Sequence, residues 1–133
     1  MRKAFMGVLL LSALAAPAFG QTTTTPATAP RFISVMDSSA LSSNLIGLDV
    51  TNAGNQTIGE IKDVVLAADK GVQGLVVSVG GFLGMGEHYV VVDPAAVAIS
   101  YDGSAKKWQA KMNATADQLK AAPAFTYQGK WKS

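Results

Sequence analysis

The stretch Val76–Val92 reads Val-Val-Ser-Val-Gly-Gly-Phe-Leu-Gly-Met-Gly-Glu-His-Tyr-Val-Val-Val. Valine-rich runs are typical of β-strands, and here two of them flank a loop that is rich in glycine. The loop also carries large apolar side chains instead of the polar groups that chemistry requires. The stretch therefore predicts part of a small β-barrel and not an active site.

The N-terminus has the features of a secretory signal peptide. Arg2 and Lys3 precede an apolar stretch, Ala4–Ala15, and small residues follow it. We expect cleavage after Gly20, with a cut after Ala18 as the alternative, so residues 1–20 form the signal. A membrane-spanning helix needs about 20 apolar residues, and an uncleaved anchor is thus the weaker reading. The prediction is a periplasmic or secreted chain that is not stably inserted in the membrane after cleavage.

Composition limits the classes of function. The chain has 11 basic and 9 acidic residues, and loss of Arg2 and Lys3 with the signal leaves a net charge of zero. Binding to nucleic acid requires a clustered basic face, which this balance argues against. The chain has no cysteine, which excludes disulfides, thiol catalysis, zinc-thiolate sites and a lipid anchor at the cleavage point.

The segment after the signal changes character twice before the domain begins. Residues 21–30 contain only Gln, Thr, Pro and Ala, which predicts a disordered linker. Residues 31–43 are transitional, since Phe32, Ile33, Val35 and Met36 could dock on the domain as a short strand. Residues 38–43 within it suggest a turn or a single helical turn. We place the barrel core at residues 44–101 and a C-terminal extension at residues 102–133.

The domain itself predicts an all-β barrel of five to six short strands with one short C-terminal helix. Strands are expected at residues 45–51, 57–67, 72–79, 88–92 and 107–112, with a helical turn at 95–99 that leads into a short strand through Tyr101. The second strand needs a bulge near Gly59 and Glu60. Thr115 and Gln118 form a capping box for a helix near 116–122, and the aromatic tail is expected to pack back on the barrel.

Three motifs in order along the chain resemble the PRC-barrel family. They are Leu-Ile-Gly-x-Asp-Val-x-Asn at residues 45–52, Ile-Gly-Glu-Ile-Lys-Asp-Val at residues 58–64, and the valine- and glycine-rich stretch at residues 72–87. A similar barrel occurs in the H subunit of the photosynthetic reaction centre and in a ribosome-maturation protein. The resemblance covers about residues 44–101 and, more loosely, 115–125. It implies a PRC-type barrel that serves as an interaction or assembly module, with no shared catalytic residues.

The glycine loop is the first candidate site. A phosphate cradle would need a lysine or a helix N-terminus behind the glycines, but a strand follows here. The apolar residues Phe82, Leu83 and Met85, with Tyr89 beside them, form a candidate interaction surface, because contiguous exposed apolar groups mark contacts. The alternative is that the loop folds back over the end of the barrel.

Catalytic side chains come together only at Glu87 and His88. His88 is the sole histidine, so no pair of histidines can bind a metal within one chain. Neighbouring residues of a strand point to opposite faces, which separates Glu87 from His88. Four further carboxylates show no spacing that forces any two together: Asp49, Glu60, Asp63 and Asp93. We therefore predict no enzyme, no cofactor and no metal site.

Two functional hypotheses remain. The favoured one is a non-enzymatic module of the cell envelope that binds an unidentified protein partner or a second copy of itself. The alternative is a small-ligand or ion binder that uses the barrel mouth near the glycine loop, Tyr89 and Tyr101. A barrel this small is normally filled by its own side chains, which weighs against the alternative.

Overall fold

The computed structural model describes residue 20, residues 29–80 and residues 86–132 of the chain. The chain divides into two units, and every helix and strand among the described residues lies in the second unit, Val35–Ser133. The fold described below is therefore that of the second unit alone.

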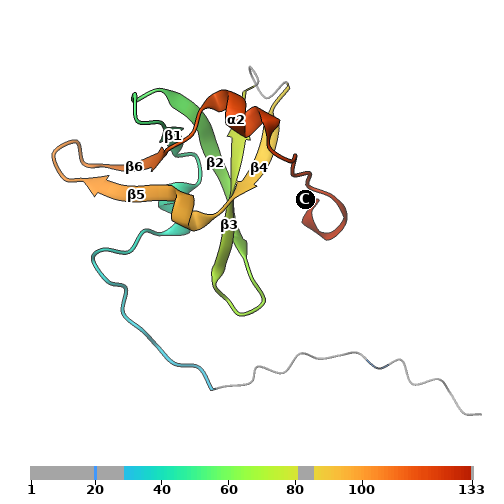
Figure 1. Cartoon of the computed structure of the whole chain (residues 1–133). Coiled ribbons are helices and arrows are strands. Elements are labelled where there is room, and N and C mark those ends of the chain that lie inside the picture. The colour runs from blue at the N-terminus through green and yellow to red at the C-terminus, as the bar shows by residue number, and fades with distance from the viewer. Residues whose placement is uncertain (1–19, 21–28, 81–85, 133) are drawn as a thin grey trace, which may run out of the picture. The chain divides into compact units, whose positions relative to one another are not determined.

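Six strands form one sheet, with short helical segments between and after them (Figure 1). The elements are α1 (Ser42–Leu45), β1 (Asp49–Thr51), β2 (Thr57–Leu66), β3 (Val72–Val79), β4 (His88–Val92), η1 (Pro94–Ala96), β5 (Val97–Asp102), β6 (Lys107–Met112), α2 (Ala116–Ala121) and η2 (Gly129–Trp131). The sheet has the order β4-β3-β2-β1-β6-β5, in which only β1 and β6 are parallel. The predicted small all-β barrel with one short helix near the C-terminus is confirmed.

The strands curl around one apolar core to which all six contribute. Val50, Ile61 and Val77 are fully buried at its centre. Leu45 of α1 and Leu119 of α2 pack against the same cluster, and in Figure 1 α2 lies over one end of the sheet. Among the described residues, the side chains of the strands themselves pack together in the interior of the barrel.

β2 owes its bend to two extra residues. Val50 of β1 is opposite Gly59 and Thr51 is opposite Thr57, so Ile58 is an additional residue on β2. Lys62 is a second one opposite β3. These bulges let three apolar side chains of β2, spaced three apart, all face the core: Ile58, Ile61 and Val64. The bulge predicted near Gly59 is confirmed.

Several elements differ from the sequence prediction. The chain from Leu45 to Leu48 is not strand, because α1 ends there and β1 begins only at Asp49. The helical turn after β4 is the 3-10 segment η1, which ends at Ala96, earlier than expected. The sheet also continues past the core boundary set at residue 101, since β6 lies between β1 and β5.

The short strand that the residues near Phe32 could have formed is not present. The segment 31–36 has no helix or strand, and its large apolar side chains are exposed. Its β-branched residues favour a strand only when a partner strand is present.

The helix α2 begins as its sequence predicts. The Thr115 hydroxyl accepts a hydrogen bond from the Gln118 backbone N–H at 3.1 Å, and the Gln118 side-chain oxygen accepts one from the Thr115 N–H at 2.9 Å. This reciprocal pair satisfies two N–H groups that a helix start leaves open. The predicted capping box is confirmed, and it fixes the point from which the C-terminal tail leaves toward β4.

Candidate functional site

The surface that the sequence predicted is only partly within the described residues. Phe82, Leu83 and Met85 lie outside them. Tyr89 is described and is half-buried. Its hydroxyl donates a hydrogen bond to Glu87 Oε2 at 2.5 Å, and its ring packs edge-on against Tyr127, with 5.7 Å between the ring centres.

The neighbours of Tyr89 belong to the outer face of the sheet. On β3, Leu75, Val77 and Val79 point into the core, so the alternation of a strand sends Val76 and Ser78 to the opposite face. Val76 is paired with Val91 of β4, and Ser78 with Tyr89. Valines therefore occupy both faces of β3 and β4, and the outer face needs its own apolar cover.

The C-terminal tail supplies this cover on one side. The Phe125 N–H donates a hydrogen bond to the Tyr89 carbonyl oxygen at 2.7 Å, which joins the tail to the edge of β4. The Phe125 ring then contacts Tyr127 and Trp131, with ring centres 5.0 and 6.2 Å apart. Val76 is buried as a result, and the expectation that the aromatic tail packs on the barrel is confirmed.

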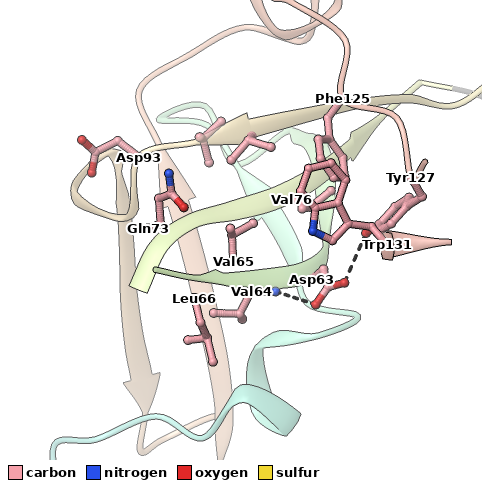
Figure 2. A pocket seen from close by; sticks show the side chains of 12 residues that line it. Asp63, Val64, Val65, Leu66, Gln73, Val76, Asp93, Phe125, Tyr127 and Trp131 are labelled. Carbon is pink, nitrogen blue, oxygen red and sulfur yellow. Dashed lines mark hydrogen bonds between the residues drawn. The ribbon is translucent and has the colours of Figure 1, made fainter. Parts of the chain in front are cut away.

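A groove of about 590 Å³ remains between the tail and the strands (Figure 2). Figure 2 shows the aromatic residues of the tail on one side of it and Val65, Leu66 and Gln73 further along the sheet. Its size falls within the range of about 300–1,000 Å³ that is typical of binding pockets. We call it the outer groove; its lining is Asp63, Val64, Val65, Leu66, Gln73, Val76, Val91, Val92, Asp93, Phe125, Tyr127 and Trp131.

A glycine keeps the surface next to the groove flat. Gly74 lies on β3 between the strands that carry Val65 and Val91. A Cβ atom at this position would lie 2.5 Å from Val91 Cγ1, well inside van der Waals contact. The absence of a side chain at Gly74 therefore lets Val91 occupy its place in the lining.

Three apolar side chains of the groove are open to solvent. Leu66 is 68% exposed, Trp131 is 58% exposed and Val91 is 44% exposed. Single exposed apolar residues are ordinary, but several that surround one groove mark a contact surface. Trp131 also has the side-chain type that most often contributes strongly to protein–protein binding.

Carboxylates stand among the apolar residues. Asp63 Oδ1 accepts a hydrogen bond from the Val64 N–H at 2.8 Å, and Asp63 Oδ2 accepts one from the Tyr127 hydroxyl at 3.4 Å. Asp93 caps η1 by accepting from the Ala95 N–H at 2.8 Å. Because the lining contains these two acids and neither Lys nor Arg, it favours an occupant that is apolar with a positive charge.

Both tyrosines of the cluster have raised pKa values. Burial is the main cause for Tyr127, and the nearby charge of Asp63 adds to it. For Tyr89 the main cause is the hydrogen bond to Glu87, followed by burial. In each case the folded state favours the neutral phenol over the phenolate.

This predicts a loss of stability in alkali that depends on Tyr127. A pKa raised in the folded state contributes stability that is complete below the unfolded value of 10.0 and is lost as the pH rises through the folded value. We expect the free energy of unfolding to fall as the pH rises above 10.0, and to fall less in Tyr127→Phe. Urea unfolding at each pH measures this, and an identical fall in both proteins would contradict it.

Glu87 and His88, the two neighbouring side chains of catalytic type, bond to different partners. His88 Nε2 donates to the Ala122 carbonyl oxygen at 3.0 Å, while Glu87 bonds to Tyr89. The histidine therefore ties the end of α2 to β4 and does not meet the glutamate. No cluster of three or more His, Cys, Asp or Glu side chains that could hold a metal occurs within residues 29–80 and 86–132.

Two carboxylates lie next to each other although the sequence did not predict it. Asp49 and Glu60 are cross-strand partners on β1 and β2, and both line a shallow hollow of about 410 Å³ together with Glu87 and Lys120. Glu60 also forms an ion pair with Lys62 at 2.9 Å. The bulge at Ile58 sets this pairing, and no spacing in the sequence reveals it.

The tyrosines of the predicted barrel mouth lie in different aromatic pairs. Tyr89 of β4 contacts Tyr127, whereas Tyr101 of β5 contacts Trp108, with 5.4 Å between ring centres. β4 and β5 are the two end strands of the sheet order. Each of the two tyrosines therefore has an aromatic partner of its own.

The sequence analysis did not single out Leu66 and Val91, and it expected Trp131 only to pack on the barrel with the rest of the tail. The unbroken valines at residues 90–92 were the available signal, because a strand that is apolar on both faces needs cover on both. The aromatic tail was the obvious source of that cover. The sequence does not predict the path that the tail takes across the strands, and it is this path that leaves a groove beside the tail.

The fold and the outer groove define a small β-barrel module with exposed apolar side chains around a groove on its outer face. A family model of the PRC-barrel domain matches residues 38–119, and the chain belongs to this family. The tail residues Phe125, Tyr127 and Trp131 come after the matched range. No curated protein matches the chain, and among the described residues no helix is long and apolar enough to cross a membrane.

Proposed function

We propose that this chain is an exported, non-enzymatic PRC-barrel module of the cell envelope that binds another protein through the outer groove. The observation that carries the proposal is the group of exposed apolar side chains at one groove: Leu66, Val91 and Trp131. Burial of such side chains against a partner is favourable by roughly 25 cal/mol per Å² of apolar surface.

A protein partner suits the groove better than a small ligand. The groove lies on the outside of the sheet, so its apolar rim stays in water until something larger covers it. Trp131, Phe125 and Tyr127 belong to the residue types that are enriched at the centres of protein interfaces. Asp63 and Asp93 already accept hydrogen bonds, which leaves few converging polar groups to orient a small molecule.

The N-terminal residues support the export part of the proposal. The pattern of Arg2 and Lys3, the apolar Ala4–Ala15 and the small residues around Gly20 is that of a cleaved signal. The non-enzymatic part is supported by the position of His88, which is engaged with the Ala122 carbonyl. Its imidazole serves the packing of α2 against β4.

The test is recovery of partners from a bacterial envelope fraction. The complete chain with a C-terminal tag is expressed, released by osmotic shock and used as bait after mild cross-linking. The double variant Leu66→Ser/Trp131→Ala should bind the main partner at least about 30-fold more weakly. This loss of affinity equals the contribution of one hot-spot residue, about 2 kcal/mol.

The matched control is Ile46→Ser, which removes another exposed apolar side chain at the end of α1. It should leave partner recovery unchanged, and circular dichroism should show both variants folded. Equal recovery with the groove variant would contradict the proposed surface, and absence of the chain from the osmotic-shock fraction would contradict export.

A further inference from the structure

The segment Arg31-Phe32-Ile33-Ser34-Val35-Met36 is itself an apolar stretch in need of a partner. Its four large apolar side chains are each at least two thirds exposed, and none of its residues belongs to a helix or strand. Ile33 and Val35 are β-branched, and Phe32 is aromatic, so the segment has the composition of a strand. A strand of this kind becomes stable only beside another strand.

The edge of β4 offers such a place. β4 is the end strand of the sheet order, and its Tyr89 carbonyl accepts from Phe125 on the side away from β3. Backbone groups alternate sides along a strand, so Val91, two residues further, directs its N–H and carbonyl to the same side. Among the described residues no tail residue bonds to Val91. The tail thus pairs with β4 at Tyr89 and leaves the edge at Val91 open.

The open edge lies directly beside the outer groove, since Val91 contributes to both. A strand added there sends alternate side chains toward the groove. In the segment these are either Arg31, Ile33 and Val35 or Phe32, Ser34 and Met36, and each set contains two large apolar side chains. The groove is lined by apolar side chains together with Asp63 and Asp93, and the segment begins with the positive charge of Arg31. The apolar alternation and the charge of the segment therefore suit the groove.

We propose that residues 31–36 of one copy add to the β4 edge of a second copy and fill its outer groove. The exchange is reciprocal, so two copies form a closed dimer with two such contacts. This inference rests on the proposed function, because it names the partner that occupies the same groove. It assigns the groove to a second copy of this chain and the segment to the role of its ligand.

The oligomeric state of the complete chain tests this first. Size-exclusion chromatography with light scattering, over a wide range of concentrations, should show a monomer that becomes a dimer. The segment variant Phe32→Ser/Ile33→Ser/Val35→Ser and the groove variant Val91→Lys should each be monomeric. The segment variant should keep the melting temperature of the monomer, because the replaced side chains are exposed.

Mixing provides a sharper test. In a mixture of the two variants, the intact segment of one can still occupy the intact groove of the other. The mixture should therefore form a heterodimer, weaker than the wild-type dimer, although neither variant dimerises alone. A dimer that survives in the segment variant would overturn the inference, and so would a wild-type chain that stays monomeric at every concentration.

A synthetic peptide covers the case in which Val91→Lys fails to fold. The peptide of residues 29–38 is added to the segment variant in a Trp108→Phe background, so that Trp131 is the remaining tryptophan. The emission maximum of Trp131 should shift as the peptide is added and should reach a plateau. A peptide of scrambled sequence should produce no shift. No shift with either peptide would overturn the inference.

The outcomes also separate this inference from the proposed function. If the chain is monomeric but Leu66→Ser/Trp131→Ala still abolishes recovery of an envelope partner, the groove binds another protein and only the inference fails. If neither self-association nor partner recovery depends on the groove, the proposed contact surface fails as well.

Discussion

Replacement of Ile61 by alanine should lower the free energy of unfolding by about 2–5 kcal/mol, the range observed when a buried isoleucine or leucine is truncated. Ile61 is fully buried at the centre of β2 and is paired with Val77 of β3. Its backbone also joins the turn before β1, since its N–H donates to the Leu48 carbonyl and its carbonyl accepts from the Gly47 N–H. The surrounding strands can therefore collapse little around the cavity.

Leu66→Ala is the matched control for Ile61→Ala. Leu66 lies on the same strand but is largely exposed, so its truncation should change the free energy of unfolding by less than about 0.5 kcal/mol. Urea unfolding of both variants measures the difference. Similar losses in the two variants would show that β2 does not bury Ile61 in the core.

Gly59→Ala should lower the free energy of unfolding by about 1–3 kcal/mol, the usual effect of overpacking. A Cβ atom at Gly59 would lie 2.6 Å from Val77 Cγ1 and 2.7 Å from the Ser78 carbonyl oxygen. The second of these is a backbone atom within the β2–β3 ladder, so it cannot turn away as a side-chain end can. The bulge that bends β2 at this point depends on the missing side chain.

Gly103→Ala serves as the comparison for Gly59→Ala. A Cβ atom at Gly103 meets nothing within 4 Å, and its φ is not in the left-handed region. This substitution should leave the thermal midpoint nearly unchanged or slightly raised, because it restricts only the unfolded chain. Equal destabilisation by the two substitutions would contradict the close approach of β2 and β3.

The parts of the fold that the sequence predicted correctly are those with local causes. The valine run at residues 72–79 and the run at residues 88–92 match β3 and β4, because β-branched residues bounded by turns favour strand. The capping box at Thr115 matches the start of α2 for the same reason: the interacting groups are three residues apart. Neighbours in the chain determined these elements.

The parts that were missed depend on contacts between distant residues. The β1 strand is short because the helical turn α1 pulls Leu45 into the core, and residues 31–36 lack the partner strand that their composition calls for. The pairing of Asp49 with Glu60 follows from a bulge whose position only the three-dimensional register reveals. Sequence spacing contains none of this information.

The outer groove is the clearest case of a feature assembled from distant segments. Its strands come from the matched family domain, whereas its aromatic wall comes from the tail after Leu119. The tail aromatics at residues 125, 127 and 131 have no regular period, so their sequence predicts that they pack but not where. Their position follows from the bond of Phe125 to the edge of β4 at Tyr89.

The claim that the outer groove is the contact surface is tested most directly by site-specific photo-cross-linking in living cells. A photoreactive residue replaces Leu66 in the groove or, as the comparison, Ser104 in the exposed β5–β6 turn. We expect discrete protein adducts, with a partner or with a second copy, from position 66 and not from position 104. Adducts of equal yield at both positions, or at position 104 alone, would contradict it.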